Sequence, residues 1–140
     1  KYVGHSEMVM SAVFSPDGNT VASSSMDGTV KIWNRGKSTD PTKTDIFGLE
    51  RCVAFSPDGT QVATASHQYW VNILDTVSRH VVRKFYGHTD YVRAVAWNRH
   101  GNQIATGADD KSVIVWDALS GSQVATLKGH SKRVNGVAFS

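Results

Sequence analysis

The chain has 140 residues, a mass of 15.2 kDa and a formal net charge of +3, with 40% hydrophobic and 19% charged residues. These values exclude a disordered tail, and no apolar run approaches the ~20 residues of a membrane span. The single cysteine, Cys52, excludes an internal disulfide framework and a zinc site built from several cysteines.

An internal repeat organises the sequence. The segment Gly4–Asn34 aligns without a gap on Gly87–Asp117, 83 residues further along the chain. A copy between them, Cys52–Ser66, matches Ser11–Ser25 at an offset of 41 residues, and a fourth copy begins at Gly129. Self-similarity at this period indicates one small supersecondary unit that is laid down several times.

Each copy is predicted to form an inner β-strand, two middle strands and an outer strand. Runs rich in Val, Ile and Thr alternate with turn signals such as Ser-Pro-Asp-Gly, and no stretch has a helical period. The first repeat has the inner strand Val9–Phe14, and its polar stretch Arg35–Asp45 predicts a short or irregular outer strand. The later predicted strands, in chain order, are Arg51–Phe55, Val81–Phe85, Val92–Trp97, Gln103–Thr106, Ser112–Trp116, Gln123–Leu127 and Val134–Phe139.

A Gly-His pair opens three of the copies, and Trp33 and Trp116 close the third strand of theirs. With these features and this period, the sequence resembles the WD-repeat (WD40) β-propeller family. The resemblance implies an all-β fold, a propeller segment made of four-stranded antiparallel blades. It divides the partial propeller 1–140 into blade one (about 4–47), a degenerate blade two (about 48–86), blade three (about 87–128) and the first strand of blade four (129–140). Because the chain starts in an outer strand and ends in an inner one, we expect a segment of a longer propeller.

The resemblance also implies a hydrogen-bonded tetrad in two blades, formed by His5, Ser23, Asp27 and Trp33, and by His88, Thr106, Asp110 and Trp116. His, Ser and Asp together would also suit a hydrolase triad. We favour a structural role because indole, hydroxyl, imidazole and carboxylate satisfy one another and leave no free nucleophile. A catalytic site would also not recur in each blade.

Blade two has lost most of the tetrad. Its equivalent residues are Ile46, Thr64, Gln68 and Leu74. Losing a hydrogen-bonded network together costs less than losing half of it. We therefore expect apolar packing to hold this blade, and we expect it to be the least regular of the three. The pattern gives Tyr69 and Trp70 no role.

The resemblance further implies a partner-binding top face. In each blade it is lined by the residues three and five positions after the Gly-His histidine and by the residue before the tetrad aspartate. These are Met8, Met10 and Met26, then Leu49, Arg51 and His67, then Tyr91, Arg93 and Asp109, and finally Arg133 and Asn135. Together these residues are expected to form an arc on the top face. The arc is apolar at one end, basic and aromatic at the other, and it contains every methionine of the chain. In the alternative interpretation Met8 and Met10 pack against neighbouring blades and Met26 caps a turn.

We expect a non-catalytic protein–protein interaction scaffold, a platform in a multiprotein assembly. Its partners would be other proteins or the remaining blades of its own propeller. The alternative is a subunit of a ribonucleoprotein or other nucleic-acid-associated complex. It would contact RNA or DNA through Arg51, Arg93, Lys132 and Arg133, although Tyr91 alone offers an aromatic ring beside them.

An enzyme is not expected, because no paired carboxylates stand apart from the tetrads and no glycine loop of phosphate-binding type occurs. The six histidines lack metal-ligand spacing, so neither a metal nor a cofactor is expected, and His67, His80 and His100 are interpreted as turn or surface residues. We expect no membrane contact and an intracellular location, with no preference among cytoplasm, nucleus and cytoskeleton.

Overall fold

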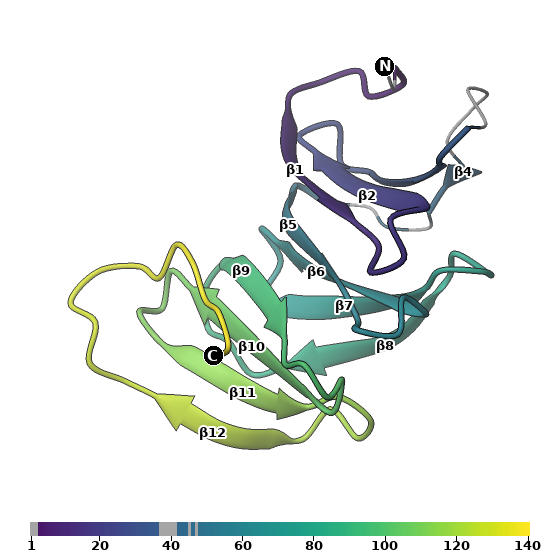
Figure 1. Cartoon of the computed structure of the whole chain (residues 1–140). Helices are drawn as coiled ribbons and strands as arrows, with labels where there is room; N and C mark the ends of the chain where they lie inside the picture. The colour runs from purple at the N-terminus through teal and green to yellow at the C-terminus, as the bar shows by residue number, and fades with distance from the viewer. Residues whose placement is uncertain (1–2, 37–41, 45, 47) are drawn as a thin grey trace.

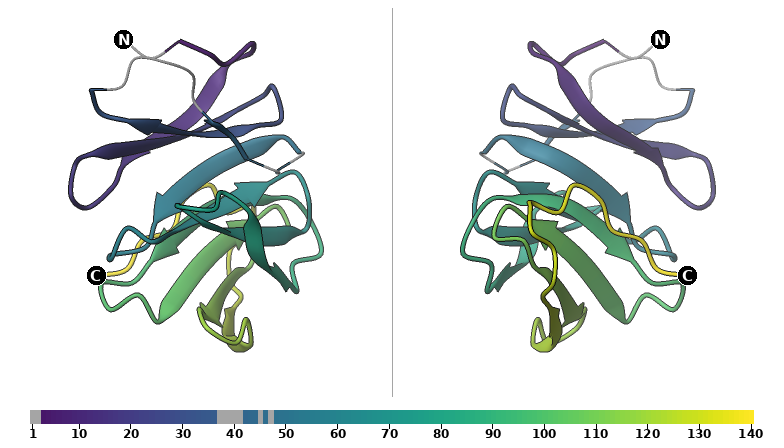
Figure 2. Two further views of the ribbon diagram at one scale, coloured as in Figure 1. Left: turned by 90° about the vertical axis from the view of Figure 1, so that its right-hand side faces the viewer. Right: turned by 90° about the vertical axis from the view of Figure 1, so that its left-hand side faces the viewer.

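The described residues form 12 β-strands and no helix. The computed structural model describes residues 3–36, 42–44, 46 and 48–140, and for 42 and 43 the backbone alone. The strands pair into three antiparallel sheets, each made of four consecutive strands. Figure 1 shows the sheets following one another in chain order, and the side views in Figure 2 show them stacked. The predicted all-β propeller segment is confirmed.

We refer to the three sheets as blades one, two and three. Blade one consists of β1 (Val9–Phe14), β2 (Thr20–Ser25), β3 (Val30–Asn34) and β4 (Thr42–Lys43). Blade two consists of β5 (Glu50–Phe55), β6 (Gln61–Ser66), β7 (Trp70–Asp75) and β8 (Val81–Tyr86). Blade three consists of β9 (Val92–Trp97), β10 (Gln103–Ala108), β11 (Val113–Asp117) and β12 (Gln123–Leu127).

Among the described residues, the outer strand of blade one has two residues, Thr42 and Lys43, and it lies within the polar stretch for which a short strand is predicted. Residues 37–41 and 45 of that stretch lie outside the described residues. The prediction that blade two is the least regular of the three is wrong, because each of its four strands has six residues. Ile46 and Leu74, which replace two tetrad members, are buried in an apolar cluster. Their packing keeps the sheet regular without the hydrogen-bonded network.

Two apolar cores join neighbouring blades, because each blade buries one face against the next. Blades one and two meet in the cluster of Ala22, Val30, Ile46, Val53, Val62 and Leu74. Blades two and three meet in a larger cluster that includes Ala65, Val71, Ile73, Phe85, Val92, Ile104 and Trp116. The cores hold the ends of all three sheets in fixed relation, which positions the turns described below.

The predicted inner strand Val134–Phe139 is not formed, since residues 133–140 carry no strand. A strand requires a hydrogen-bonded neighbour along its length. Here the chain is held instead by the Val134 amide, which donates to the Ala108 carbonyl at 2.9 Å, and by burial of the Val134 side chain. The segment therefore lies against blade three as extended chain (Figure 1).

Gly107 makes room for this C-terminal segment. A Cβ atom at Gly107 would lie 2.5 Å from Val134 Cγ1 and 3.1 Å from Val137 Cγ1. We expect Gly107→Ala to displace the segment and to speed hydrogen exchange at the Val134 amide by about tenfold, because overpacking costs about 1–3 kcal/mol. Gly136→Ala is the matched control, since a Cβ there meets nothing within 4 Å. Equal exchange in both variants would contradict the packing described.

Candidate interaction face

One end of the three blades carries the residues predicted to meet a partner. Antiparallel pairing places the turns β2–β3, β6–β7 and β10–β11 at the same end as the starts of the inner strands β1, β5 and β9. We call this end the top face. The turns that follow the inner strands lie at the opposite end.

A β-bulge near the start of each inner strand turns one side chain out of the ladder. The register of β1 with β2 skips Met10, that of β5 with β6 skips Arg51, and that of β9 with β10 skips Arg93. Such bulges re-aim the side chain of the extra residue. Each bulged residue is the middle member of one of the three predicted sets Met8–Met10–Met26, Leu49–Arg51–His67 and Tyr91–Arg93–Asp109, which we call trios. The same kind of bulge therefore turns the middle side chain of each trio out of the ladder.

A main-chain hydrogen bond closes each trio. The amides of Met26, His67 and Asp109 donate to the carbonyls of Met8, Leu49 and Tyr91, over 2.9, 3.0 and 2.9 Å. Side chains add to this in two blades. Arg51 Nε donates to His67 Nε2, and the Arg93 guanidinium donates to both carboxylate oxygens of Asp109. The structure thus brings the three members of each trio together.

The methionine trio is open to solvent at two of its three positions. Met8 is 63% and Met26 is 42% exposed, while Met10 is half-buried. The alternative interpretation requires Met8 to pack against a neighbouring blade, and Met8 is too exposed for that. Met10 lines a small hollow beside Leu49. Exposed methionines next to an exposed leucine make this end of the arc apolar and adaptable.

The opposite end of the arc carries an aromatic stack that joins blades two and three. The His67 and Tyr91 rings lie 4.6 Å apart with an angle of 17° between their planes. Tyr69 adds a third ring, 5.7 Å from Tyr91. The sequence pattern gave Tyr69 no role, but its position in the β6–β7 turn, one residue after Gln68, would have placed it on the top face.

The fourth repeat contributes residues that lie in the C-terminal segment. Arg133 and Asn135 are both exposed. The hydrogen bond from Arg93 lowers the pKa of Asp109, and the charges of Arg93, Arg133 and Arg51 lower it further, so Arg133 is near this carboxyl. Arg133 therefore extends the basic end of the arc.

Blade three contains a continuous hydrogen-bonded relay. Trp116 Nε1 donates to Thr106 Oγ1 at 2.8 Å, Thr106 Oγ1 lies 2.7 Å from His88 Nε2, and His88 Nδ1 lies 2.7 Å from Asp110 Oδ2. The indole can only donate, so the hydroxyl accepts from it and donates to Nε2. The N–H at Nδ1 then donates a hydrogen bond to the Asp110 carboxylate, so every member of the relay has a partner.

Blade one repeats the relay with Trp33, Ser23, His5 and Asp27, over 2.8, 2.7 and 2.8 Å. The imidazoles are shielded, with side chains 4% exposed in blade one and 0% in blade three. Burial acts to raise the pKa of Asp27, but hydrogen bonds from Thr29, His5 and Ser6 outweigh it and hold that pKa far below its usual value.

Asp110 is held ionised in the same way. Burial acts to raise its pKa, but hydrogen bonds from Ser112, His88 and the Thr89 amide lower the pKa to about 2. The carboxylate is therefore a permanent acceptor at neutral pH, and it fixes the imidazole tautomer.

Blade two contains a buried carboxyl that the sequence pattern did not single out. Glu50 stands in β5 where the other repeats have Val9 and Val92, and its side chain is fully buried. Neither of its oxygens completes a well-formed hydrogen bond with the described residues. Burial raises the pKa of Glu50 to about 7, although the neighbouring Thr64 hydroxyl lowers it. A glutamate among aligned valines was the signal that could have revealed it.

Trp70, the other residue without a predicted role, is the first residue of β7, directly after the β6–β7 turn. It packs 5.7 Å from Tyr86, and the Lys84 ammonium lies 5.2 Å above its ring. Its indole N–H donates to Asn72 Oδ1 at 3.2 Å. These contacts tie the middle strand β7 to the outer strand β8.

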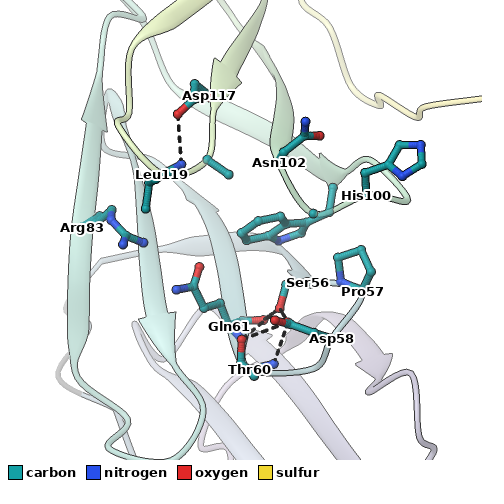
Figure 3. A pocket seen from close by; sticks show the side chains of 13 residues that line it. Ser56, Pro57, Asp58, Thr60, Gln61, Arg83, His100, Asn102, Asp117 and Leu119 are labelled. Carbon is teal, nitrogen blue, oxygen red and sulfur yellow. Dashed lines mark hydrogen bonds between the residues drawn. The ribbon is translucent and has the colours of Figure 1, made fainter.

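At the end opposite the top face, a hollow of about 440 Å³ separates blades two and three. Figure 3 shows Arg83 on one side of it and Pro57 and His100 on the other. A second hollow of about 570 Å³ lies between blades one and two, again with Pro57 in its lining. The hollow recurs at successive blade junctions, so it belongs to the architecture of the repeat.

Across the ranges that the structure describes, no three His, Cys, Asp or Glu side chains lie close enough together to hold a metal ion. The same residues include no helix of the length and apolarity that crossing a membrane requires.

The segments that match a known protein family correspond to the four copies of the repeat. The family described as "WD domain, G-beta repeat" matches residues 1–34, 45–74, 79–117 and 121–140. Coatomer subunit beta'-1 of Arabidopsis thaliana is 38% identical over 98 residues, which cover 66% of this chain and 10% of the coatomer subunit.

Solved structures show the same likeness. The chain superimposes on "Structure of U3-55K" with a TM-score of 0.85 and 26% identity, over 96% of this chain and 43% of that one. "Crystal structure of RRP9 WD40 repeats" gives a TM-score of 0.85 and 27% identity, over 96% and 42%. The chain thus spans less than half the length of these proteins.

Proposed function

Because the chain belongs to the WD40-repeat family, we propose that it acts as a non-catalytic platform for protein–protein contacts, as a segment of a larger propeller in a multiprotein assembly. WD40 domains are typically interaction platforms. We further propose that the units of the platform are residues 4–47, 48–86 and 87–128, with 129–140 opening a fourth blade.

The observation that carries this proposal is the bulged arrangement of the top face. Three trios lie at one end of the sheets, and each presents a bulged side chain of the inner strand. Together they display methionine, leucine, tyrosine and arginine. Adaptable apolar side chains beside Tyr and Arg are the composition of residues that dominate protein interfaces.

The two tetrads support the non-catalytic part of the proposal. Each hydroxyl already accepts from an indole and lies against an imidazole, and each imidazole lies against a carboxylate. A nucleophile requires a hydroxyl that can meet a substrate. We therefore assign the tetrads the structural role of fixing the strands of blades one and three.

A photo-crosslinking amino acid placed at Met26 tests the platform. We expect discrete protein adducts in cells, and none from the same group at Val77, an exposed control residue at the opposite end. Met8→Asp should lower the adduct yield about fivefold, as for a residue worth about 1 kcal/mol at an interface, with an unchanged melting temperature. Adducts of equal yield at both sites, or insensitive to Met8→Asp, would contradict the proposal.

A further inference from the structure

The basic and aromatic end of the top face combines charge and ring surface in one place. We name it the Arg–Tyr patch and define it by Arg51, His67, Tyr69, Tyr91, Arg93 and Arg133. Its residues come from blade two, blade three and the C-terminal segment.

Positive charge is in excess in the Arg–Tyr patch. Asp109 lies at its centre, and the hydrogen bond from Arg93 lowers the pKa of that carboxyl first, followed by the charges of Arg93, Arg133 and Arg51. Asp90 acts on Arg93 from the edge. The charges that act on Asp109 and Arg93 thus come from three guanidinium groups and two carboxylates. One further carboxylate from outside would complete the balance.

His67 contributes an acceptor to the patch. Burial lowers the pKa of His67, and the charges of Arg51 and Arg93 lower it further against the opposing charge of Asp109. The imidazole is therefore neutral at neutral pH, and its Nε2 accepts from Arg51 Nε. This bond holds the Arg51 guanidinium beside the aromatic stack.

The ring surface and the neighbouring trio define the rest of the binding partner. The His67 and Tyr91 rings stack on each other, while the residues Tyr69 and Tyr91 remain 49% and 38% exposed. Beyond Arg51 the top face continues into Leu49 and Met26, which are exposed and apolar. Nucleobases need open ring faces in series, whereas aliphatic side chains fit this surface.

Building on the proposed function, we propose that the Arg–Tyr patch and the adjoining Leu49 and Met26 bind an acidic, aliphatic segment of a partner protein. A carboxylate of that segment pairs with Arg51 and Arg133 beside Asp109. An aliphatic side chain next to it packs on Leu49 and Met26. Charge-assisted hydrogen bonds from arginine supply the specificity.

Fluorescence anisotropy on the full chain tests this proposal with three labelled probes. They are a short peptide of alternating glutamate and leucine, the same peptide with lysine in place of glutamate, and a short oligouridylate. We expect the glutamate peptide to bind at least about tenfold more tightly than either other probe. Tighter binding of the oligouridylate, or equal binding of the two peptides, would overturn the proposal.

Matched charge reversals locate the binding site. Arg133→Glu should weaken the glutamate peptide about tenfold, because it changes an exposed side chain within the patch. Arg99→Glu, the same change at an exposed position at the opposite end, should leave the affinity unaltered. Equal effects of the two variants would overturn the proposal. If the glutamate peptide fails to bind while Met26 still gives discrete cross-links, the acidic partner is refuted and the platform stands.

Discussion

Replacing Asp110 by alanine is expected to lower the free energy of unfolding by about 3 kcal/mol. The carboxylate accepts hydrogen bonds from the Ser112 hydroxyl and amide, from the Thr89 amide and from His88 Nδ1. Without it, a buried imidazole N–H loses its acceptor at the end of a relay that starts at an indole. Urea unfolding followed by tryptophan fluorescence measures the loss.

Asp58→Ala is the control for this prediction. Asp58 also accepts hydrogen bonds within its own turn, from Ser56 and Thr60, but it lies exposed. We expect a loss of about 1 kcal/mol or less. A loss in Asp110→Ala no larger than that of Asp58→Ala would show that the relay contributes nothing beyond an ordinary turn.

Glu50→Gln is expected to raise the free energy of unfolding at pH 8 by about 3 kcal/mol. The folded chain holds the Glu50 proton up to a pKa of about 7, whereas the unfolded chain releases it near 4.5. Between these values the unfolded state binds fewer protons, so stability falls as the pH rises, and it levels off above about 7. Glutamine has the same shape and does not titrate.

The measurement is the stability difference between the two chains at several pH values. The difference should be small below pH 4.5, grow up to about 7 and stay constant above it. Subtraction removes contributions from other titrating groups, such as His67, whose pKa is lowered in the folded chain. If the stability difference did not depend on pH, Glu50 would have the same pKa in the folded and unfolded states, which would contradict the prediction.

The sheets could be predicted from the sequence because each strand lies between strong turn signals and recurs at a fixed offset. The bounds of β1, β9 and β12 follow the prediction residue by residue. The tetrad residues were implied by the resemblance to the WD-repeat family, and the structure places them in hydrogen-bond contact. Because the unit repeats, a pattern recognised in one copy also locates the equivalent strands in the others.

Other features depend on contacts that one repeat does not contain. Whether Val134–Phe139 becomes a strand depends on a neighbour to pair with, and propensity alone does not supply one. The stack of Tyr69 on Tyr91 joins two blades, so it needs their relative placement. Glu50 lines a small hollow together with Met10 and Met26 of blade one, so its surroundings also depend on a second repeat.

The bulges also bear on how such a chain can diversify. One residue in each inner strand stands outside the ladder, so the alternation of inward and outward side chains resumes after it without slipping. That position can exchange methionine for arginine, as it does between blades one and two, while the packing beneath is preserved. Each repeat thus has one position that can vary without disturbing the sheet. A row of repeats can therefore change its top face one side chain at a time.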